Sequence, residues 1–157
     1  MALALVLVAA TVFFWVDDAK ASPGDTGAEG LSRQSKAVSK AAKDETLAFL
    51  TVDYKNMDAL IAKVLSGASG SFKEQYSGAR SNLKTSAARA KAVSTGKVLS
   101  VGISDIDKDN AVVFVAANSQ VTNTSTKGKA VPRYYRLKLT MVRQGDTWRT
   151  SDLQFVG

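Results

Sequence analysis

Hydrophobic and polar residues follow three different patterns along the chain. Residues 1–16 are apolar except for Thr11, and none of them is charged. From about residue 28 to residue 93 the apolar residues recur near the helical period of 3.6, and after Lys97 they alternate with a period of two. Residues 17–30 are rich in Gly, Pro, Asp and Ser, which is typical of a linker. The pattern therefore predicts an apolar N-terminal segment (1–16), a linker (17–30) and an α+β domain (31–157).

Three interpretations of the apolar segment remain open. A helix of sixteen residues covers about 24 Å, which is shorter than the roughly 30 Å of a bilayer core. A membrane anchor is favoured because aromatic residues close the segment and prefer the membrane–water interface. A signal peptide cleaved near Ala19-Lys20-Ala21 lacks the expected basic start, and a buried helix is the third interpretation. The expected anchor residues are Leu3, Leu5, Val6, Leu7, Val8, Val12, Phe13, Phe14 and Trp15.

The remaining patterns predict three helices followed by four strands. The helices are expected at about 28–52, 57–65 and 71–93, with the last one ending before Gly96. The strands are expected at 98–106, 111–123, 132–143 and 147–156, joined by short turns such as Gln144-Gly145-Asp146. Short connections predict an antiparallel meander, and the helices would cover its apolar face. The side chains expected to face the core include Leu99, Val101, Ile103, Tyr135, Leu137, Leu139 and Met141.

Composition and charge narrow the possible functions. The chain has no Cys and no His, so thiol nucleophiles, thiolate metal sites and histidine-based catalysis are excluded. Its 21 Lys and Arg against 14 Asp and Glu give a net charge of +7, which favours acidic partners. Motifs for nucleic-acid stacking are missing, so nucleic acid is not an expected partner. One stripe of positive charge on the first helix is either a solvated face or a contact for anionic lipid or a partner: Arg33, Lys36, Lys40 and Lys43.

Two further groups of residues are candidate sites of chemistry. Asp105, Asp107 and Asp109 have the spacing of a calcium loop, but Asn110 and Ala116 replace its Gly and Glu, so a hairpin turn is predicted. A proton-transfer enzyme without His would need an Asp base and a Tyr donor. The available groups are Asp53, Asp152, Tyr54, Tyr76, Tyr134 and Tyr135, and the sequence does not bring them together. We therefore expect no catalytic residue, no metal and no cofactor.

An ordered set of short segments carries a resemblance to a known family. The segments are 47–56 (LAFLTVDYKN), 65–72 (LSGASGSF) with Tyr76, 96–98 (GKV), 101–102 (VG), 135–137 (YRL), 145–148 (GDTW) and 151–153 (SDL). Over about residues 35–157 the chain resembles the Mce-associated membrane proteins of actinobacteria. The uncharged, short N-terminal segment departs from that family, since no basic residue flanks it.

The resemblance implies a single-pass protein of the cytoplasmic membrane with a cystatin-like or nuclear-transport-factor-2-like domain on the extracytoplasmic side. Such proteins accompany Mce transporters, which move lipids or sterols across the mycobacterial envelope. The implied partners are the transporter permease, the Mce subunits and membrane lipid. We therefore expect a non-enzymatic accessory subunit that acts through protein contacts. The alternatives are a domain of the same shape that carries a lipid, and a ketosteroid-isomerase-like enzyme.

Overall fold

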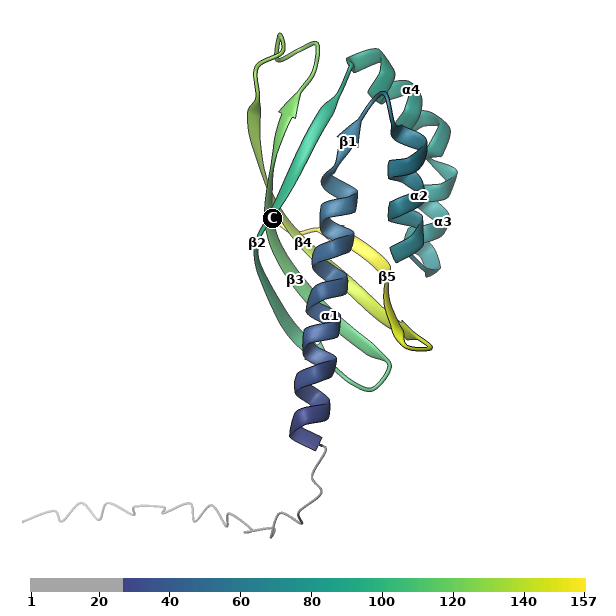
Figure 1. Cartoon of the computed structure of the whole chain (residues 1–157), viewed down its shortest axis with the longest axis vertical. Coiled ribbons are helices and arrows are strands. Elements are labelled where there is room, and N and C mark those ends of the chain that lie inside the picture. Colours follow the sequence, from purple (N-terminus) through teal and green to yellow (C-terminus); the bar gives the residue numbers. More distant parts are fainter. Residues whose placement is uncertain (1–26) are drawn as a thin grey trace, which may run out of the picture.

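The computed structural model describes residues 27–157, so the predicted anchor and the predicted linker up to residue 26 lie outside the described residues (Figure 1). Four helices and five strands follow one another in this part of the chain. They are α1 (Gly27–Leu50), β1 (Val52–Asp53), α2 (Met57–Gly67), α3 (Gly70–Gly78), α4 (Arg80–Ala90), β2 (Val93–Ile106), β3 (Asn110–Thr122), β4 (Val131–Gln144) and β5 (Thr147–Phe155). Among residues 27–157, no helix is both long enough and apolar enough to cross a bilayer.

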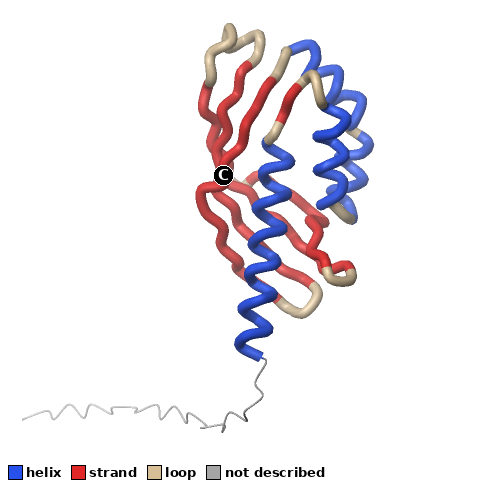
Figure 2. Tube along the Cα trace, in the orientation of Figure 1, coloured by secondary structure: helices blue, strands red, loops and turns tan. Residues whose placement is uncertain are grey.

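The five strands form one antiparallel sheet in the order β1-β2-β3-β4-β5. Figure 2 shows the helices gathered on one side of this curved sheet. Strand β3 pairs with β4 in an unbroken register from Asn110–Val142 to Val121–Val131. The β2–β3 ladder contains two bulges, between Val98 and Ser100 and between Ile103 and Asp105. A bulge adds one unpaired residue and increases the local twist, so β2 bends around the helices.

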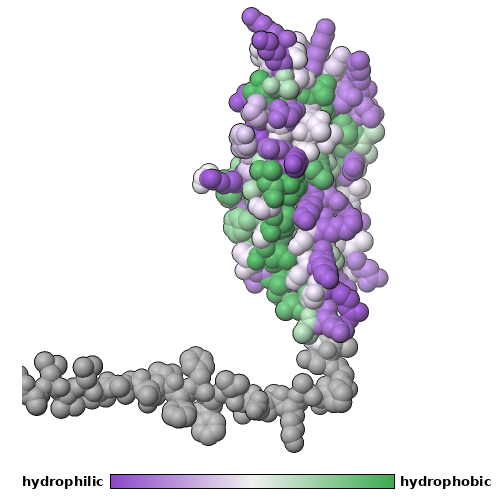
Figure 3. Space-filling view, turned by 60° about the vertical axis from the view of Figure 1, so that its left-hand side comes forward, coloured by the Kyte–Doolittle hydropathy of each residue, from purple (hydrophilic) through white to green (hydrophobic). Residues whose placement is uncertain are grey.

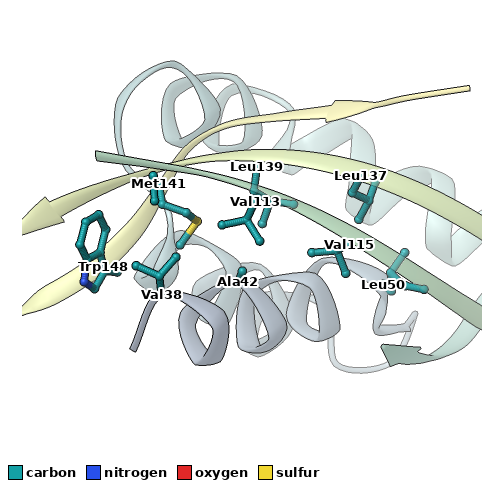
Figure 4. Packing of buried hydrophobic residues seen from close by; sticks show 11 residues of the cluster. Val38, Ala42, Leu50, Val113, Val115, Leu137, Leu139, Met141 and Trp148 are labelled. Carbon is teal, nitrogen blue, oxygen red and sulfur yellow. The ribbon is translucent and has the colours of Figure 1, made fainter. Parts of the chain in front are cut away.

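Helix α1 forms the main core with the inner face of the sheet. Its buried residues recur at steps of three and four, as in Val38, Ala42, Glu45 and Thr46, which places them on one stripe. Figure 4 shows Val38 and Ala42 of α1 facing side chains of β3 and β4. The inward residues of β4 are fully buried, and burying each such side chain stabilises the fold by about 1.5–3 kcal/mol. They are Leu137, Leu139 and Met141.

Two smaller clusters join the remaining helices to this core. Ala48, Val64, Ala68 and Phe72 connect α1 with α2 and α3. Met57, Ile61 and Ala87 connect α2 with α4. On the surface, Asp58 of α2 accepts hydrogen bonds from Arg80 (2.8 Å) and Lys84 (2.7 Å) of α4. These bonds lower the pKa of the Asp58 carboxyl, with the hydrogen bond from Lys84 as the larger cause.

The two edges of the sheet differ. At β5, the backbone N–H of Ser69 donates to the Thr150 carbonyl (2.8 Å) and the Ser71 hydroxyl donates to the Ser151 carbonyl (3.1 Å). The junction of α2 and α3 therefore covers that edge. At β2, strand β1 pairs only with Val93 and Ser94. Beyond Ser94, no strand of residues 27–157 pairs with this second edge of β2.

The structure confirms the α+β class and the helices-then-strands order, and corrects several details. The predicted helix 71–93 is two helices, because the chain turns at Gly78 and Ala79 between α3 and α4. A fifth strand, β1, follows α1, which ends at Leu50. Strand β2 begins at Val93, so Gly96 lies within a strand, where a Cβ atom would approach Leu50 Cβ to 2.8 Å. Residues 27–30, assigned to the linker, form the first turn of α1.

Candidate interaction surfaces

The predicted basic stripe lies on the exposed side of α1. Arg33, Lys36, Lys40 and Lys43 are all exposed. Lys40 forms an ion pair with Asp44 one turn later, whereas the other three take part in none of the ion pairs within residues 27–157. Three charges of the stripe are therefore not paired within residues 27–157, and the exposed pair of Lys40 contributes little stability.

A groove runs between α1 and the open edge of β2. It has a volume of about 540 Å³ and is lined by Ser39, Lys43, Leu47 and residues 96–101. Two lysines, Lys43 and Lys97, contribute the charges, and no carboxylate is among the lining residues. Leu99 is 52% exposed here, although the alternation predicted it to face the core. The bulge between Val98 and Ser100 explains the error, because the extra residue shifts the side chains that follow by one position.

The outer face of the sheet carries a second apolar area. Phe114 of β3 is 42% exposed and Tyr134 of β4 is 74% exposed. Gly102 of β2 pairs with Phe114, so no side chain covers the ring from that strand. A groove of about 540 Å³ lies nearby, with Tyr134, Arg136, Leu99 and the C-terminal residues 156–157 in its wall. The side of the molecule that Figure 3 turns forward carries a hydrophobic band bordered by hydrophilic side chains.

Aromatic side chains form a chain of contacts that runs from the helices to the end of β5, where Phe155 is 62% exposed. The Phe49 ring lies 6.0–6.1 Å from the rings of Phe72, Tyr76 and Phe155, measured between centroids. Phe155 in turn lies 6.2 Å from Tyr135, whose hydroxyl is 3.2 Å from that of Ser119. Tilted rings at such distances attract one another beyond the area they bury. Contacts between aromatic rings therefore join α1 and α3 to β4 and β5.

A buried carboxyl that the sequence did not indicate lies between α1 and α2. Glu45 is 3% exposed, and its Oε1 atom has no hydrogen-bond partner. Its carboxylate lies against Gly67, where a Cβ atom would overlap it. Burial raises the pKa of Glu45 from 4.5 to about 8, so the carboxyl is mostly protonated at neutral pH. No local sequence signal distinguishes Glu45 from the exposed charges of α1, because its burial depends on a glycine in another helix.

A cleft of about 250 Å³ adjoins Glu45. Lys63 and Gly67 of α2 and Trp148 and Arg149 of β5 line it. The Arg149 guanidinium donates to the Ser66 carbonyl at the end of α2, while its Nε atom is buried without a partner. The pKa of Tyr76 is raised, first by burial and then by Glu45, which is ionised at the alkaline pH at which a tyrosine titrates. The cleft therefore contains both the protonated carboxyl of Glu45 and the positively charged guanidinium of Arg149, which is held by its hydrogen bond to Ser66.

The remaining candidate groups for proton transfer lie apart in small local structures. Asp53 Oδ1 accepts a hydrogen bond from the Lys55 N–H (3.0 Å), and Asp152 Oδ2 accepts one from the Gln154 amide (2.6 Å). Both carboxyls are half-exposed. The Asp107 carboxylate closes the predicted hairpin turn by accepting the N–H groups of residues 109 and 110, which lowers its pKa. These aspartates therefore close turns or pair locally.

Comparison with solved structures defines the class of the fold. The periplasmic domain of DotI superposes with a TM-score of 0.63 at 14% identity, covering 77% of this chain and 94% of that one. CagV, a VirB8 homologue of the type IV secretion system of Helicobacter pylori, gives 0.61 at 6% identity, covering 77% and 97%. A ketosteroid isomerase-like protein from Erwinia carotovora atroseptica gives 0.51 at 16% identity, covering 78% and 95%. The domain therefore has the predicted nuclear-transport-factor-2-like α+β fold.

The sequence itself defines the family. Residues 2–157 match the family described as "Uncharacterized protein Rv1363c/MT1408-like", and the chain belongs to that family. A curated relative, Rv1363c of Mycobacterium tuberculosis H37Rv, is 29% identical over 130 residues. The match covers 82% of this chain and 49% of the relative, so the chain spans about half the length of that protein.

Proposed function

We propose that this protein is a membrane-anchored accessory subunit that stabilises an Mce-type lipid import complex through protein contacts. The observation that carries the proposal is the exposure of large apolar side chains on the outer face of the sheet. Phe114 and Tyr134 are 42% and 74% exposed, and Tyr134 lines a groove together with Arg136. Aromatic residues and arginine are the residue types that dominate binding energy at protein interfaces. This face therefore has the composition of a docking surface.

Two resemblances support the location and the partner class. The short segments described above resemble Mce-associated membrane proteins, whose domains stand outside the cytoplasmic membrane beside the transporter. The DotI structure with the same fold is that of a periplasmic domain. An anchor formed by residues 1–16 would hold the domain on the extracytoplasmic side of the membrane, within reach of permease and Mce subunits.

The packing of the interior favours protein contacts over lipid carriage or turnover. A lipid carrier of this fold needs an apolar cavity between the sheet and the helices. Phe49, Phe72 and Tyr76 place rings about 6 Å apart in that space. Because these rings take up the space for a lipid, native mass spectrometry of the purified chain should detect no bound lipid.

A ketosteroid-isomerase-like enzyme would in addition need an Asp and a Tyr that face the same cavity.

The proposal is tested by purifying the tagged full chain from an actinobacterial membrane in mild detergent. Permease and Mce subunits should co-purify, and the variant F114S/Y134S should recover them at a level reduced about tenfold or more, as expected for loss of interface anchors. Leu31→Ser is the matched control, since Leu31 on α1 is 52% exposed. Recovery of the chain alone, or equal recovery by the control and the double variant, would contradict the proposal.

A further inference from the structure

The open edge of β2 offers backbone groups that no part of residues 27–157 uses. Strand β1 pairs only with Val93 and Ser94, so β2 is paired on one side alone from Thr95 to Ile106. An unpaired edge presents a row of N–H and C=O groups that can hydrogen-bond to another strand. The opposite edge, at β5, is already covered by the hydrogen bonds of Ser69 and Ser71. Within residues 27–157, the edge of β2 is therefore the long unpaired stretch of the sheet, whereas the middle of β5 is occupied.

Side chains next to this edge are apolar and incompletely covered. Val98, Val101 and Ile103 point toward the core but are only half-buried, whereas their neighbours on β3 are buried. Leu99 is 52% exposed at the first bulge. The groove of about 540 Å³ between α1 and residues 96–101 follows the same edge. A strand placed there would cover these side chains as β3 covers those on its own side.

The charges at the groove indicate what kind of strand it accepts. Lys43 lies on the α1 side, and Lys97, which pairs with Asn118, lies on the outer face of the sheet. Neither lysine forms an ion pair with any of residues 27–157, and no carboxylate lines the groove. An incoming segment that carries carboxylates on both faces and apolar residues between them would match these charges.

We propose that the edge of β2 from Thr95 to Ile106 binds an extended acidic and apolar segment of a partner protein by strand addition. Backbone hydrogen bonds to β2 would supply affinity, and the alternate side chains of the segment would supply specificity. The two bulges restrict the pairing to short stretches on either side of them, which disfavours pairing with a long flat strand. This inference deepens the proposed function, on which it rests for the identity of the partner.

The experiment uses the full chain in a neutral detergent and the fluorescein-labelled peptide GEVVEVVEG, which has carboxylates on both faces of a strand. Fluorescence anisotropy should show saturable binding, and hydrogen exchange of the β2 amides should slow when the peptide is added. The variant K43E/K97E should bind about tenfold or more weakly, because it replaces attraction by repulsion. The matched control K73E/K129E carries the same change of charge at exposed lysines elsewhere and should bind like the parent. Equal weakening by both double variants would overturn the proposal, and circular dichroism verifies that each is folded.

Backbone pairing is tested separately with two N-methylated peptides. Alternate N–H groups of an added strand face β2, so methylation of one alternate set should abolish binding while methylation of the other set should leave it within about twofold. Equal binding by both methylated peptides would overturn strand addition. Self-association of the chain that K43E/K97E abolishes would assign the edge to a second copy and would also overturn the proposal. Peptide binding without recovery of Mce subunits would instead contradict the proposed function and leave the strand site standing.

Discussion

Replacing Glu45 with glutamine isolates the effect of a carboxyl that the fold keeps neutral between α1 and α2. The pKa of Glu45 is about 8 in the folded protein and 4.5 in an exposed chain, because burial removes water from the charged form. One pKa unit corresponds to about 1.36 kcal/mol, so the difference is worth roughly 4 to 5 kcal/mol. Glutamine has nearly the same shape and no charge at any pH. The variant therefore removes the titration and keeps the packing.

The direction of the effect follows from which state holds the proton. Below pH 4.5 the Glu45 carboxyl is protonated in both states, so its burial costs the parent no stability through this titration. As the pH rises from 4.5 to 8, the unfolded chain releases the proton while the folded protein retains it, so stability falls. Glu45→Gln should thus equal the parent near pH 4 and exceed it by roughly 4 kcal/mol near pH 8. Groups that do not contact Glu45 titrate alike in the parent and in the variant, so their contributions cancel in this difference.

Urea unfolding at several pH values measures the difference directly. The fluorescence of Trp148, which lines the cleft and is buried, reports on this region, and circular dichroism reports on the whole domain. A stability difference that does not change between pH 4 and pH 8 would refute the reasoning. A variant less stable than the parent at pH 8 would show that Lys63 or Arg149 stabilises an ionised Glu45.

Three further predictions concern packing and surface charge. Gly67→Ala should destabilise the domain by about 1–3 kcal/mol in thermal unfolding, since the new methyl group overlaps the buried Glu45 carboxyl. Gly30→Ala on α1 is the control. Its methyl group meets no atom within 4 Å, so this variant should be neutral or slightly stabilising. Gly96→Ala should likewise be costly, because the methyl group meets the last residue of α1, and Gly102→Ala in the same strand has open space around it and serves as its control. Asp58→Asn should destabilise the domain only slightly, less than Gly67→Ala does, and should lose its effect in high salt, as expected for exposed ion pairs; a large, salt-independent loss would contradict this.

Regular elements of the fold could be predicted because their side chains follow one period without interruption. In β4, Leu137, Leu139 and Met141 alternate with polar residues and are fully buried, as predicted. Strand β1 could not be predicted, since two residues are too few to show a period. The break between α3 and α4 is also invisible to periodicity, because Gly78 and Ala79 are both compatible with a continuous helix.

Only part of the candidate surfaces could be predicted from the sequence. The basic stripe on α1 was predicted from spacing, and its four residues are exposed. The exposed position of Leu99 depends on a bulge, which is set by pairing with β3 and has no signature in β2 itself. The burial of Glu45 depends on Gly67, which is distant in sequence. Both features arise from contacts between elements, which a local pattern does not contain.

The bonds from Ser69 and Ser71 to β5 have a consequence for stoichiometry. They occupy the middle of β5, so a strand can add to the sheet of residues 27–157 more readily at β2 than at β5. Domains with two unpaired sheet edges can associate edge to edge without limit and form fibres. A domain with one unpaired edge can bind only one further strand. Each domain would therefore seat one partner strand, and raising the protein concentration would saturate that position without producing fibres.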